Sequence, residues 1–349
     1  MSDLLKIGIV GLGKMGTIRA REIGKHPSTA LVRAADPNPE TFSALPGVAC
    51  STDFESVIQS NVDAVFVCTP NCFTPQVVIA ALEAGKHVFC EKPPGRTLSD
   101  IHAILQAEER NPGLKLQFGF NHRYHAGIQE AHRIVHSGRL GRILWLRGVY
   151  GKSGGSGFEQ SWRSSKQLCG GGILLDQGIH MLDLFRLFCG DFVEVKSMVS
   201  TCYWSIDVED NVFALLRDRE GRPAMLHSSS TQWKHRFNLE IYMSDGYLSV
   251  NGILSSTRSY GDETITVARK QFDEGFASGK PREEIIYFDT DPSWELELAD
   301  FVKHIQEDTP VKSGTSEQAL KAMELVFAIY DDDGSSHSPD RSARGLADR

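Results

Sequence analysis

Short apolar runs alternate with amphipathic stretches through the first third of the chain. The runs are typical of buried strands, and the stretches repeat apolar residues three and four positions apart, as helices do. Strands that alternate with helices favour a parallel, doubly wound sheet, so we expect an α/β fold here. The predicted strands are 6–10, 30–35, 62–68, 87–90 and 114–120, and the later predicted helices are 75–84 and 99–110.

The second half of the chain is rich in predicted strands instead. They are 193–201, 212–216, 225–231, 237–243 and 247–250, with turns at 218–222 and 245–246. Successive strands of this kind favour a broad antiparallel sheet, which has one face for the core and another for a partner. The aromatic candidates for the partner face are Tyr203, Trp204, Trp233 and Phe237.

Two helices are predicted to close the fold, at 292–306 and 315–330. The second opens with the capping box Thr315-Ser316-Glu317-Gln318. A length of 349 residues suits two domains. We predict a dinucleotide-binding domain at 1–122, a substrate-binding and oligomerisation domain at 123–330, and a polar, disordered or peripheral tail at 331–349.

Composition excludes several classes of protein. The formal net charge is -8, which argues against a nucleic-acid binder. No apolar run reaches the roughly 18 residues that span a bilayer. The first residues show no basic segment followed by an apolar core, so we expect no signal peptide. The 7 cysteines form no CxxC pair, which predicts free thiols, a reducing cytoplasm and no metal site.

A glycine motif follows the first predicted strand at once. It reads Gly11-Leu12-Gly13-Lys14-Met15-Gly16. Gly11 allows a tight turn, Gly13 lets the backbone approach a pyrophosphate, and Gly16 lets the next helix pack closely on the strand. Asp36 ends the second strand, where a carboxylate binds ribose hydroxyls and repels a 2′-phosphate. The pattern therefore predicts dinucleotide binding, with NAD favoured over NADP, although Arg33 leaves NADP open. The alternative is a flavodoxin-like turn that binds nothing.

Polar residues follow the ends of three later predicted strands. They are Thr69-Pro70-Asn71, Glu91-Lys92-Pro93 and Asn121-His122-Arg123. Ligands of doubly wound sheets bind beyond the carboxyl ends of the strands, so these groups are candidate site residues.

The segments GLGKMG, TPN, AGKHVFCEKP and GGGILLDQGIHMLDL together resemble the Gfo/Idh/MocA family of oxidoreductases. The resemblance implies a Rossmann domain followed by an α/β domain with a large, open, mostly antiparallel sheet. It implies NAD(P)-dependent oxidation or reduction of a hydroxyl or ketone, most often on a sugar or cyclitol. It also implies a homodimer or homotetramer formed through that sheet.

Carried over by position, Lys92 resembles the family's active-site lysine, and Asp176 and His180 resemble its Asp and His pair. Many members place a His where this chain has Thr74, so Thr74 is left out of the site. The expected cofactor contacts are Gly11, Gly13, Lys14, Met15, Gly16, Asp36, Thr69, Pro70, Asn71, Glu91 and Lys92.

The spacing of Asp176, His180 and Asp183 places all three on one face of a regular helix. We expect neutral His180 to accept the hydroxyl proton, Asp176 to orient it, and Lys92 to stabilise charge on the reacting oxygen. His180 as a core histidine and a metal-binding face remain alternatives. We also expect a cis peptide bond before Pro93 or Pro94. The expected substrate contacts are Lys92, Asn121, Arg123, Trp162, Arg163, Asp176 and His180.

Three function classes remain open at this point. The first is an NAD-dependent dehydrogenase, or the matching keto-reductase, that acts on a sugar, a cyclitol or a sugar derivative. The second is a glycoside hydrolase that recycles a tightly bound NAD internally. The third is a redox sensor that binds NAD without turnover, but such a protein has no need of Lys92, Asp176 and His180.

Overall fold

The computed structural model describes residues 4–273, 276–277 and 279–334. The chain divides into two compact units. The first comprises 1–121, 167–170 and 294–321, and the second comprises 122–166, 171–293 and 322–349. The predicted boundary at residue 122 lies beside the first division, but the predicted contiguous second domain differs from this arrangement, because 167–170 and 294–321 return to the first unit.

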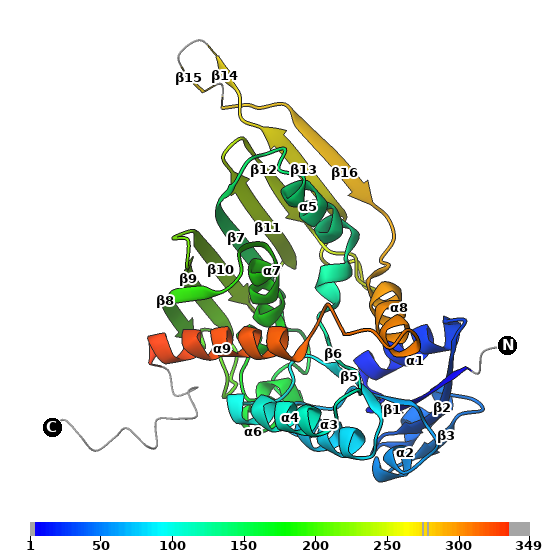
Figure 1. The fold of residues 1–349 in the computed structure, drawn as a ribbon. Helices are drawn as coiled ribbons and strands as arrows, with labels where there is room; N and C mark the ends of the chain where they lie inside the picture. Colours follow the sequence, from blue (N-terminus) through cyan, green and yellow to red (C-terminus); the bar gives the residue numbers. More distant parts are fainter. Residues whose placement is uncertain (1–3, 274–275, 278, 335–349) are drawn as a thin grey trace. The chain divides into compact units, whose positions relative to one another are not determined.

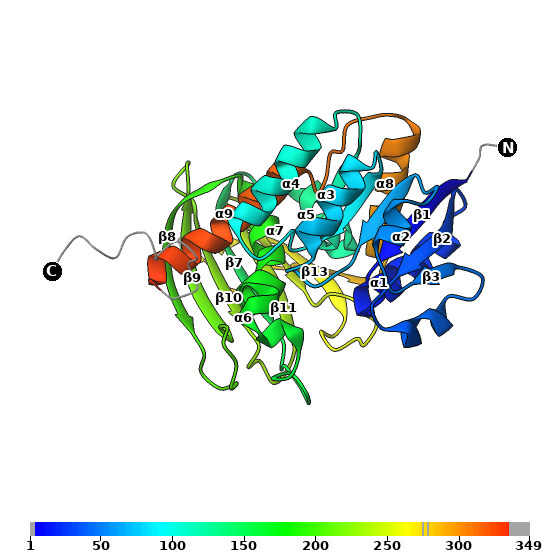
Figure 2. The same ribbon diagram turned by 90° about the horizontal axis from the view of Figure 1, so that it is seen from below.

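A six-stranded parallel sheet forms the centre of the first unit (Figures 1 and 2). Its order is β3-β2-β1-β4-β5-β6, as expected of a doubly wound sheet. The strands are β1 (Leu5–Val10), β2 (Thr29–Ala35), β3 (Ala49–Ser51), β4 (Ala64–Val67), β5 (His87–Glu91) and β6 (Leu116–Gly119). The helices around it are α1 (Lys14–Lys25), α2 (Glu55–Ile58), α3 (Thr74–Glu83), α4 (Leu98–Arg110) and α8 (Ser293–Gln306), with the 3-10 turn η1 (Pro39–Ala44) and the short α6 (Lys166–Cys169).

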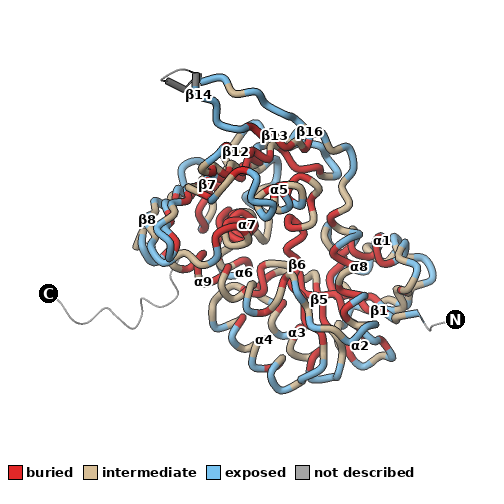
Figure 3. Tube along the Cα trace, turned by 45° about the horizontal axis from the view of Figure 1, so that its top comes forward, coloured by how far each residue is buried: buried red, intermediate tan, exposed pale blue. Residues whose placement is uncertain are grey.

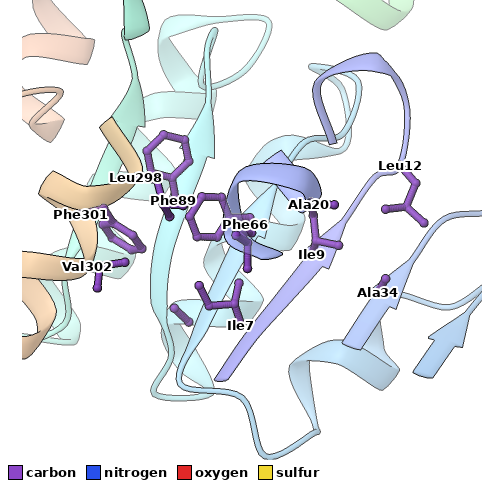
Figure 4. Close-up of a cluster of buried hydrophobic side chains, with 12 residues drawn as sticks. Ile7, Ile9, Leu12, Ala20, Ala34, Phe66, Phe89, Leu298, Phe301 and Val302 are labelled. Carbon is purple, nitrogen blue, oxygen red and sulfur yellow. The ribbon is translucent and has the colours of Figure 1, made fainter. Parts of the chain in front are cut away.

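Helix α8 belongs to the core of this unit although it comes late in the sequence. Its Phe301 meets the rings of Phe66 and Phe89 edge-on, each with centroids 5.6 Å away. Leu298 and Val302 join the same buried cluster with Ile7 and Ile9 (Figure 4). Burial of this much apolar surface fixes α8 against the sheet. The other face of the parallel sheet packs on α2, where Gly8 of β1 leaves room for the Val57 side chain.

An eight-stranded sheet forms the centre of the second unit, with order β16-β13-β12-β11-β7-β10-β9-β8. Only the β7–β10 pair is parallel, so the expectation of a mostly antiparallel sheet is confirmed. Figure 3 shows its inner strands largely buried and the edge near β16 more exposed. The strands are β7 (Ile143–Gly151), β8 (Phe192–Ser200), β9 (Asn211–Asp218), β10 (Pro223–Ser229), β11 (Arg236–Met243), β12 (Gly246–Asn251), β13 (Glu263–Arg269) and β16 (Glu283–Phe288), with a separate pair β14 (Phe272–Asp273) and β15 (Phe276–Ala277).

Helices cover one face of this sheet. They are α5 (Ala126–His136) and α7 (Ile179–Cys189), and α7 is preceded by a π-helical turn, η4 (Leu174–Gly178). Two 3-10 turns, η2 (Asn121–Tyr124) and η3 (Trp162–Ser164), complete the elements before α7. The last helix, α9 (Ser316–Asp333), opens with the predicted capping box, since Gln318 N–H donates to Thr315 Oγ1 and Thr315 N–H to Gln318 Oε1.

The predicted polar tail begins too early. Residues 331–333 are helical, and their acidic side chains contact strand β8. Asp332 accepts from Lys196 Nζ at 2.7 Å and from the Ser197 backbone, and Asp333 accepts from the Val199 backbone. These acceptors extend the helix beyond its apolar pattern. Residues 335–349 of the predicted tail lie outside the described part of the chain.

A buried arginine joins three elements of the first unit. Arg19 of α1 donates to Glu91 of β5 at 2.7 Å and to Glu297 of α8 at 2.5 Å. The rings of Phe89 and Trp294 lie 4.3 and 4.6 Å from its guanidinium carbon. Burial raises the pKa of Glu297 to about 7. The positive charge of Arg19 lowers this pKa, and the negative charge of Glu91 raises it.

Glu297→Gln should therefore change how stability depends on pH. The pKa is higher in the folded than in the unfolded state, so the wild type loses stability as pH rises from about 4.5 to 7. The neutral amide does not titrate. Between about pH 4.5 and 7 the free energy of unfolding of the variant should therefore rise by on the order of 3 kcal/mol relative to that of the wild type. Urea unfolding at pH 5 and pH 8 measures the difference. Parallel pH dependence in the two proteins would contradict the assignment.

Candidate functional site

The glycine turn has the geometry that its sequence predicts. Gly11 has a φ of 93°, and a Cβ there would lie 2.5 Å from the Cys68 carbonyl oxygen. A Cβ on Gly16 would collide with the carbonyl oxygen of Gly11. Open space surrounds Gly13, the residue that precedes α1, and the first turn of α1 has no acidic side chain. The N–H groups at the start of α1 are therefore suited to a pyrophosphate.

Asp36 lies beside this turn, at the end of β2. Its Oδ2 accepts a hydrogen bond from Leu12 N–H at 2.6 Å, and its Oδ1 accepts from Asn38 N–H at 2.9 Å. The carboxylate is thus fixed against the glycine turn, where ribose hydroxyls are bound in this type of fold. These residues fit an NAD molecule, which would rest its pyrophosphate on the start of α1 and its adenosine ribose on Asp36.

The side chains of Asn71 and Glu91 have structural partners. Asn71 Nδ2 donates to the Cys169 carbonyl at 2.7 Å and so ties the segment 167–170 to the loop after β4. Glu91 is paired with Arg19, as described above. Thr69 lies at the same strand end, where its hydroxyl is 3.0 Å from that of Thr74. Cofactor contacts by Thr69, Pro70, Asn71 and Glu91 stay a prediction, and these partners favour backbone rather than side-chain contacts for Asn71 and Glu91.

Lys92 follows β5 directly at the carboxyl edge of the parallel sheet. The peptide bond between Lys92 and Pro93 is cis, as predicted. Pro93 and Pro94 are buried, whereas the Lys92 side chain is half-buried. Since β1 and β5 are parallel strands separated by β4, Lys92 and the glycine turn lie at the same edge of the sheet.

In the second unit, Asp176 meets two cations. Lys152 Nζ lies 2.8 Å from Oδ2 of Asp176, and Arg163 Nε lies 3.5 Å from Oδ1. The Arg163 guanidinium lies over the Trp162 ring at 4.4 Å. The structure therefore brings the predicted residues Asp176, Trp162 and Arg163 together. The sequence reading missed Lys152, which the glycine-rich stretch after β7 carries.

Asp176, His180 and Asp183 do not all lie in the one regular helix that their spacing assumes. Asp176 lies in a π-helical turn, which changes the side-chain spacing of a regular helix. Asp183 is buried and accepts two hydrogen bonds from Arg123, at 2.7 and 2.5 Å. Such a buried bidentate pair is strong, and its loss is costly. Arg123 thus has a structural role, and its contact with substrate stays a prediction.

His180 is buried in the same unit. Its ring stacks on that of His122, with centroids 3.7 Å apart. His122 in turn lies 2.9 Å from the Tyr150 hydroxyl through Nε2. Asn121, also buried, ends the first unit one residue earlier. The sequence places His122 among the candidate site residues after the last parallel strand, but nothing in the spacing links it to His180, 58 positions away.

The aromatic residues predicted for a partner face separate into two groups. Tyr203 and Trp233 are exposed, and their rings meet edge-on at 4.9 Å. Trp204 is half-buried and donates to the Ser230 carbonyl. Phe237, by contrast, is buried against Tyr150, so its assignment to that face is wrong. Alternation along β11 turns Phe237 toward the helices.

The described residues lack two features. They contain no group of three or more His, Cys, Asp or Glu side chains arranged to hold a metal ion. Among them, no helix has both the length and the apolar character needed to cross a membrane. All seven cysteines are free thiols, and burial raises the pKa of Cys68, Cys90 and Cys189.

Comparison with known proteins gives two family matches. Residues 5–120 match the oxidoreductase family with an NAD-binding Rossmann fold, and residues 128–249 match the GFO/IDH/MocA C-terminal domain. Levoglucosan dehydrogenase of Pseudarthrobacter phenanthrenivorans is 34% identical over 212 residues, which are 56% of this chain and 54% of the relative. Myo-inositol 2-dehydrogenase of Thermotoga maritima is 26% identical over 341 residues, 93% of this chain and 95% of the relative.

Solved structures show the same fold. Levoglucosan dehydrogenase in complex with NADH and levoglucosan superposes with a TM-score of 0.84 at 23% identity, over 95% of this chain and 98% of the other. Myo-inositol 2-dehydrogenase from Lactobacillus plantarum gives a TM-score of 0.79 at 24% identity, again over 95% and 98%. Together with the two family matches, the glycine turn, Asp36 and Lys92 lead to one assignment: the chain belongs to the Gfo/Idh/MocA family of NAD-binding oxidoreductases.

Proposed function

We propose that this protein transfers a hydride between NAD and a carbon that bears a hydroxyl or ketone in a sugar, a cyclitol or a sugar derivative. The main support is that the glycine turn with Asp36 and the half-buried Lys92 lie at the same edge of the parallel sheet. The relatives named above are dehydrogenases of an anhydrosugar and of a cyclitol, which supports this substrate class. None of them is a hydrolase, so the glycoside hydrolase alternative gains no support.

The proposed chemistry gives each polar group one task. When bound, NAD⁺ supplies the acceptor for the hydride and its electron pair. The Lys92 ammonium stabilises negative charge as it develops on the substrate oxygen. The neutral His180 imidazole takes the hydroxyl proton, and in the reducing direction its imidazolium returns it.

The remaining groups serve substrate binding. Asp176, with Lys152 and Arg163, offers both acceptors and donors to sugar hydroxyls. The Trp162 ring, under the Arg163 guanidinium, provides an apolar surface of the kind that packs on sugar C–H groups. Asp176 also holds this pair of cations in place, and its role in orienting His180 stays a prediction.

Absorbance at 340 nm tests the function. The purified protein is mixed with NAD or NADP and a panel of sugars, cyclitols and nucleotide sugars, and NADH formation is followed. We expect steady NADH production with one substrate class. No NADH with any compound, together with NAD released on denaturation, would instead favour an internally recycled cofactor.

Asp36 should set the choice of cofactor. Asp36→Asn keeps an oxygen acceptor for Leu12 N–H but removes the charge that repels a 2′-phosphate. The ratio of kcat/KM for NADP to that for NAD should rise at least about tenfold, an energy of about 1.4 kcal/mol. Glu40→Ala, an exposed carboxylate on η1, is the control. An unchanged ratio in Asp36→Asn would remove Asp36 from cofactor recognition.

We also propose that the open face of the eight-stranded sheet binds a second copy of the chain. Met198, Phe213 and Leu215 are exposed large apolar residues on strands β8 and β9 of this face. Phe213 stacks on His227, and Trp145 stacks on Tyr242. An exposed apolar surface of this kind marks an interaction site.

Light scattering during size-exclusion chromatography tests this interface. The wild type should elute as a dimer or tetramer, and Leu215→Glu should shift it toward the monomer, because a charge is then buried without a partner. Lys25→Glu on α1 is the matched control and should leave the mass unchanged. A monomeric wild type would refute the interface. A cytoplasmic location stays a prediction.

A further inference from the structure

The rings of His122 and His180 form a buried pair within the second unit. Their planes are inclined by only 21° with centroids 3.7 Å apart. The exposed fraction is 5% for His122 and 4% for His180. His122 comes from η2 and His180 from the start of α7, so two distant segments are folded to bring these imidazoles face to face.

A neutral hydroxyl anchors the His122 ring. Its Nε2 lies 2.9 Å from the Tyr150 hydroxyl, and Tyr150 is hydrogen-bonded to Tyr260. Burial raises the pKa of Tyr150 well above its ordinary value, so the phenol keeps its proton. Phe237 packs edge-on against Tyr150 and limits the movement of this ring. The anchor therefore fixes the orientation of His122. Unlike a carboxylate, the neutral hydroxyl does not favour the charged form of the ring.

The carboxylates on the surrounding elements have cationic or backbone partners. Asp183 of α7 is paired with Arg123. Glu263 of β13 accepts from Gly127 N–H at 2.7 Å and lies 2.9 Å from Nδ1 of His125, whose ring meets that of His122 edge-on.

Asp176 of η4 completes this set, with Lys152 and Arg163 as its cations. Each of these carboxylates thus has other partners that hold it in place. A proton on one imidazole then opposes a second proton on the other, because like charges in contact disfavour each other.

We propose that His122 is a positioning residue for hydride transfer: by stacking on His180 it fixes that ring and allows the pair to hold only one proton. When the single proton lies on His122, His180 is neutral and ready to accept the hydroxyl proton at a pH where an isolated imidazole is still partly charged. This inference rests on the proposed function for its use in catalysis, but the pairing itself is a property of the protein without substrate.

Nuclear magnetic resonance of protein labelled with ¹³C and ¹⁵N in histidine tests the pairing, with His180→Asn used to assign the signals. In the wild type, the two rings should titrate in separate steps about two pH units apart or more. His122→Phe keeps a flat ring on His180 but removes the competing charge, so the pKa of His180 should rise by at least about one unit.

His136→Phe is the matched control, because His136 also lies against a second histidine, His132, with ring centroids 3.9 Å apart on α5. It should leave the titration of His180 unchanged. If His122→Phe does not fold, the wild-type titration still decides: two independent steps near the ordinary histidine pKa of about 6.5 would overturn the pairing.

The pH profile of kcat/KM tests the role in catalysis. In His122→Phe its acidic limb should move to higher pH by the same amount as the pKa of His180. A moved pKa with an unmoved limb would overturn the positioning role, while the pairing stands. Absence of turnover in the wild type would count against the proposed function and leave the resonance result as the test of the pair.

Discussion

Lys92→Ala should lower kcat at least about a hundredfold, the scale expected when a group that stabilises transition-state charge is lost. The side chain follows β5 at the carboxyl edge of the parallel sheet, next to a cis proline bond and two buried prolines. A hydroxyl that loses a hydride and a proton develops charge on oxygen, and a nearby ammonium lowers the energy of that state. Steady-state turnover at saturating NAD measures the effect.

The affinity for NAD should change little in Lys92→Ala, because the glycine turn and Asp36 carry the proposed cofactor contacts. Lys25→Ala, an exposed lysine on α1, is the control and should keep wild-type turnover. A Lys92→Ala enzyme with normal kcat would show that this lysine has no role in the chemistry. A large loss of NAD binding would move its role to the cofactor.

His180→Ala should also lower turnover at least about a hundredfold, since general acid–base catalysis contributes roughly that much or more. The ring is buried and stacked on His122, which holds the proposed proton acceptor in one orientation. Added imidazole should restore part of the activity if the lost function is proton transfer. Turnover with and without imidazole is the measurement.

His136→Ala on the exposed end of α5 is the control for His180→Ala. Thermal unfolding of both variants separates loss of chemistry from loss of fold. Normal turnover in His180→Ala would establish the alternative left open by the sequence, in which His180 is a core histidine. A folded, inactive variant that imidazole rescues would exclude it.

The sequence was sufficient where local chemistry determines structure. The roles of Gly11 and Gly16 depend on close backbone contacts that no larger residue allows, and the structure confirms both. The capping box at Thr315 is likewise a local pattern, as is the alternation that predicts β9 and β11. Such features need only a few consecutive residues to specify them.

Features that depend on distant residues were not predictable in this way. The apolar face of α8 shows that the helix is buried, but not that Phe301 packs on Phe66 and Phe89 in the first unit. The pairing of Arg123 with Asp183 joins residues 60 positions apart in the sequence, so no local pattern indicates it. The π-helical turn at Asp176 has no sequence signal of its own. Nothing in the glycine-rich stretch around Lys152 indicates that this lysine pairs with Asp176.

In the proposed reaction the hydride passes directly between the substrate carbon and NAD. The most direct measurement uses the substrate found in the 340-nm panel, prepared with deuterium on the carbon that carries the reacting hydroxyl, and mass spectrometry of the NADH formed. We expect one deuterium in each NADH molecule and a primary isotope effect on turnover that His122→Phe does not abolish. Unlabelled NADH, with the deuterium lost to water, would contradict direct transfer.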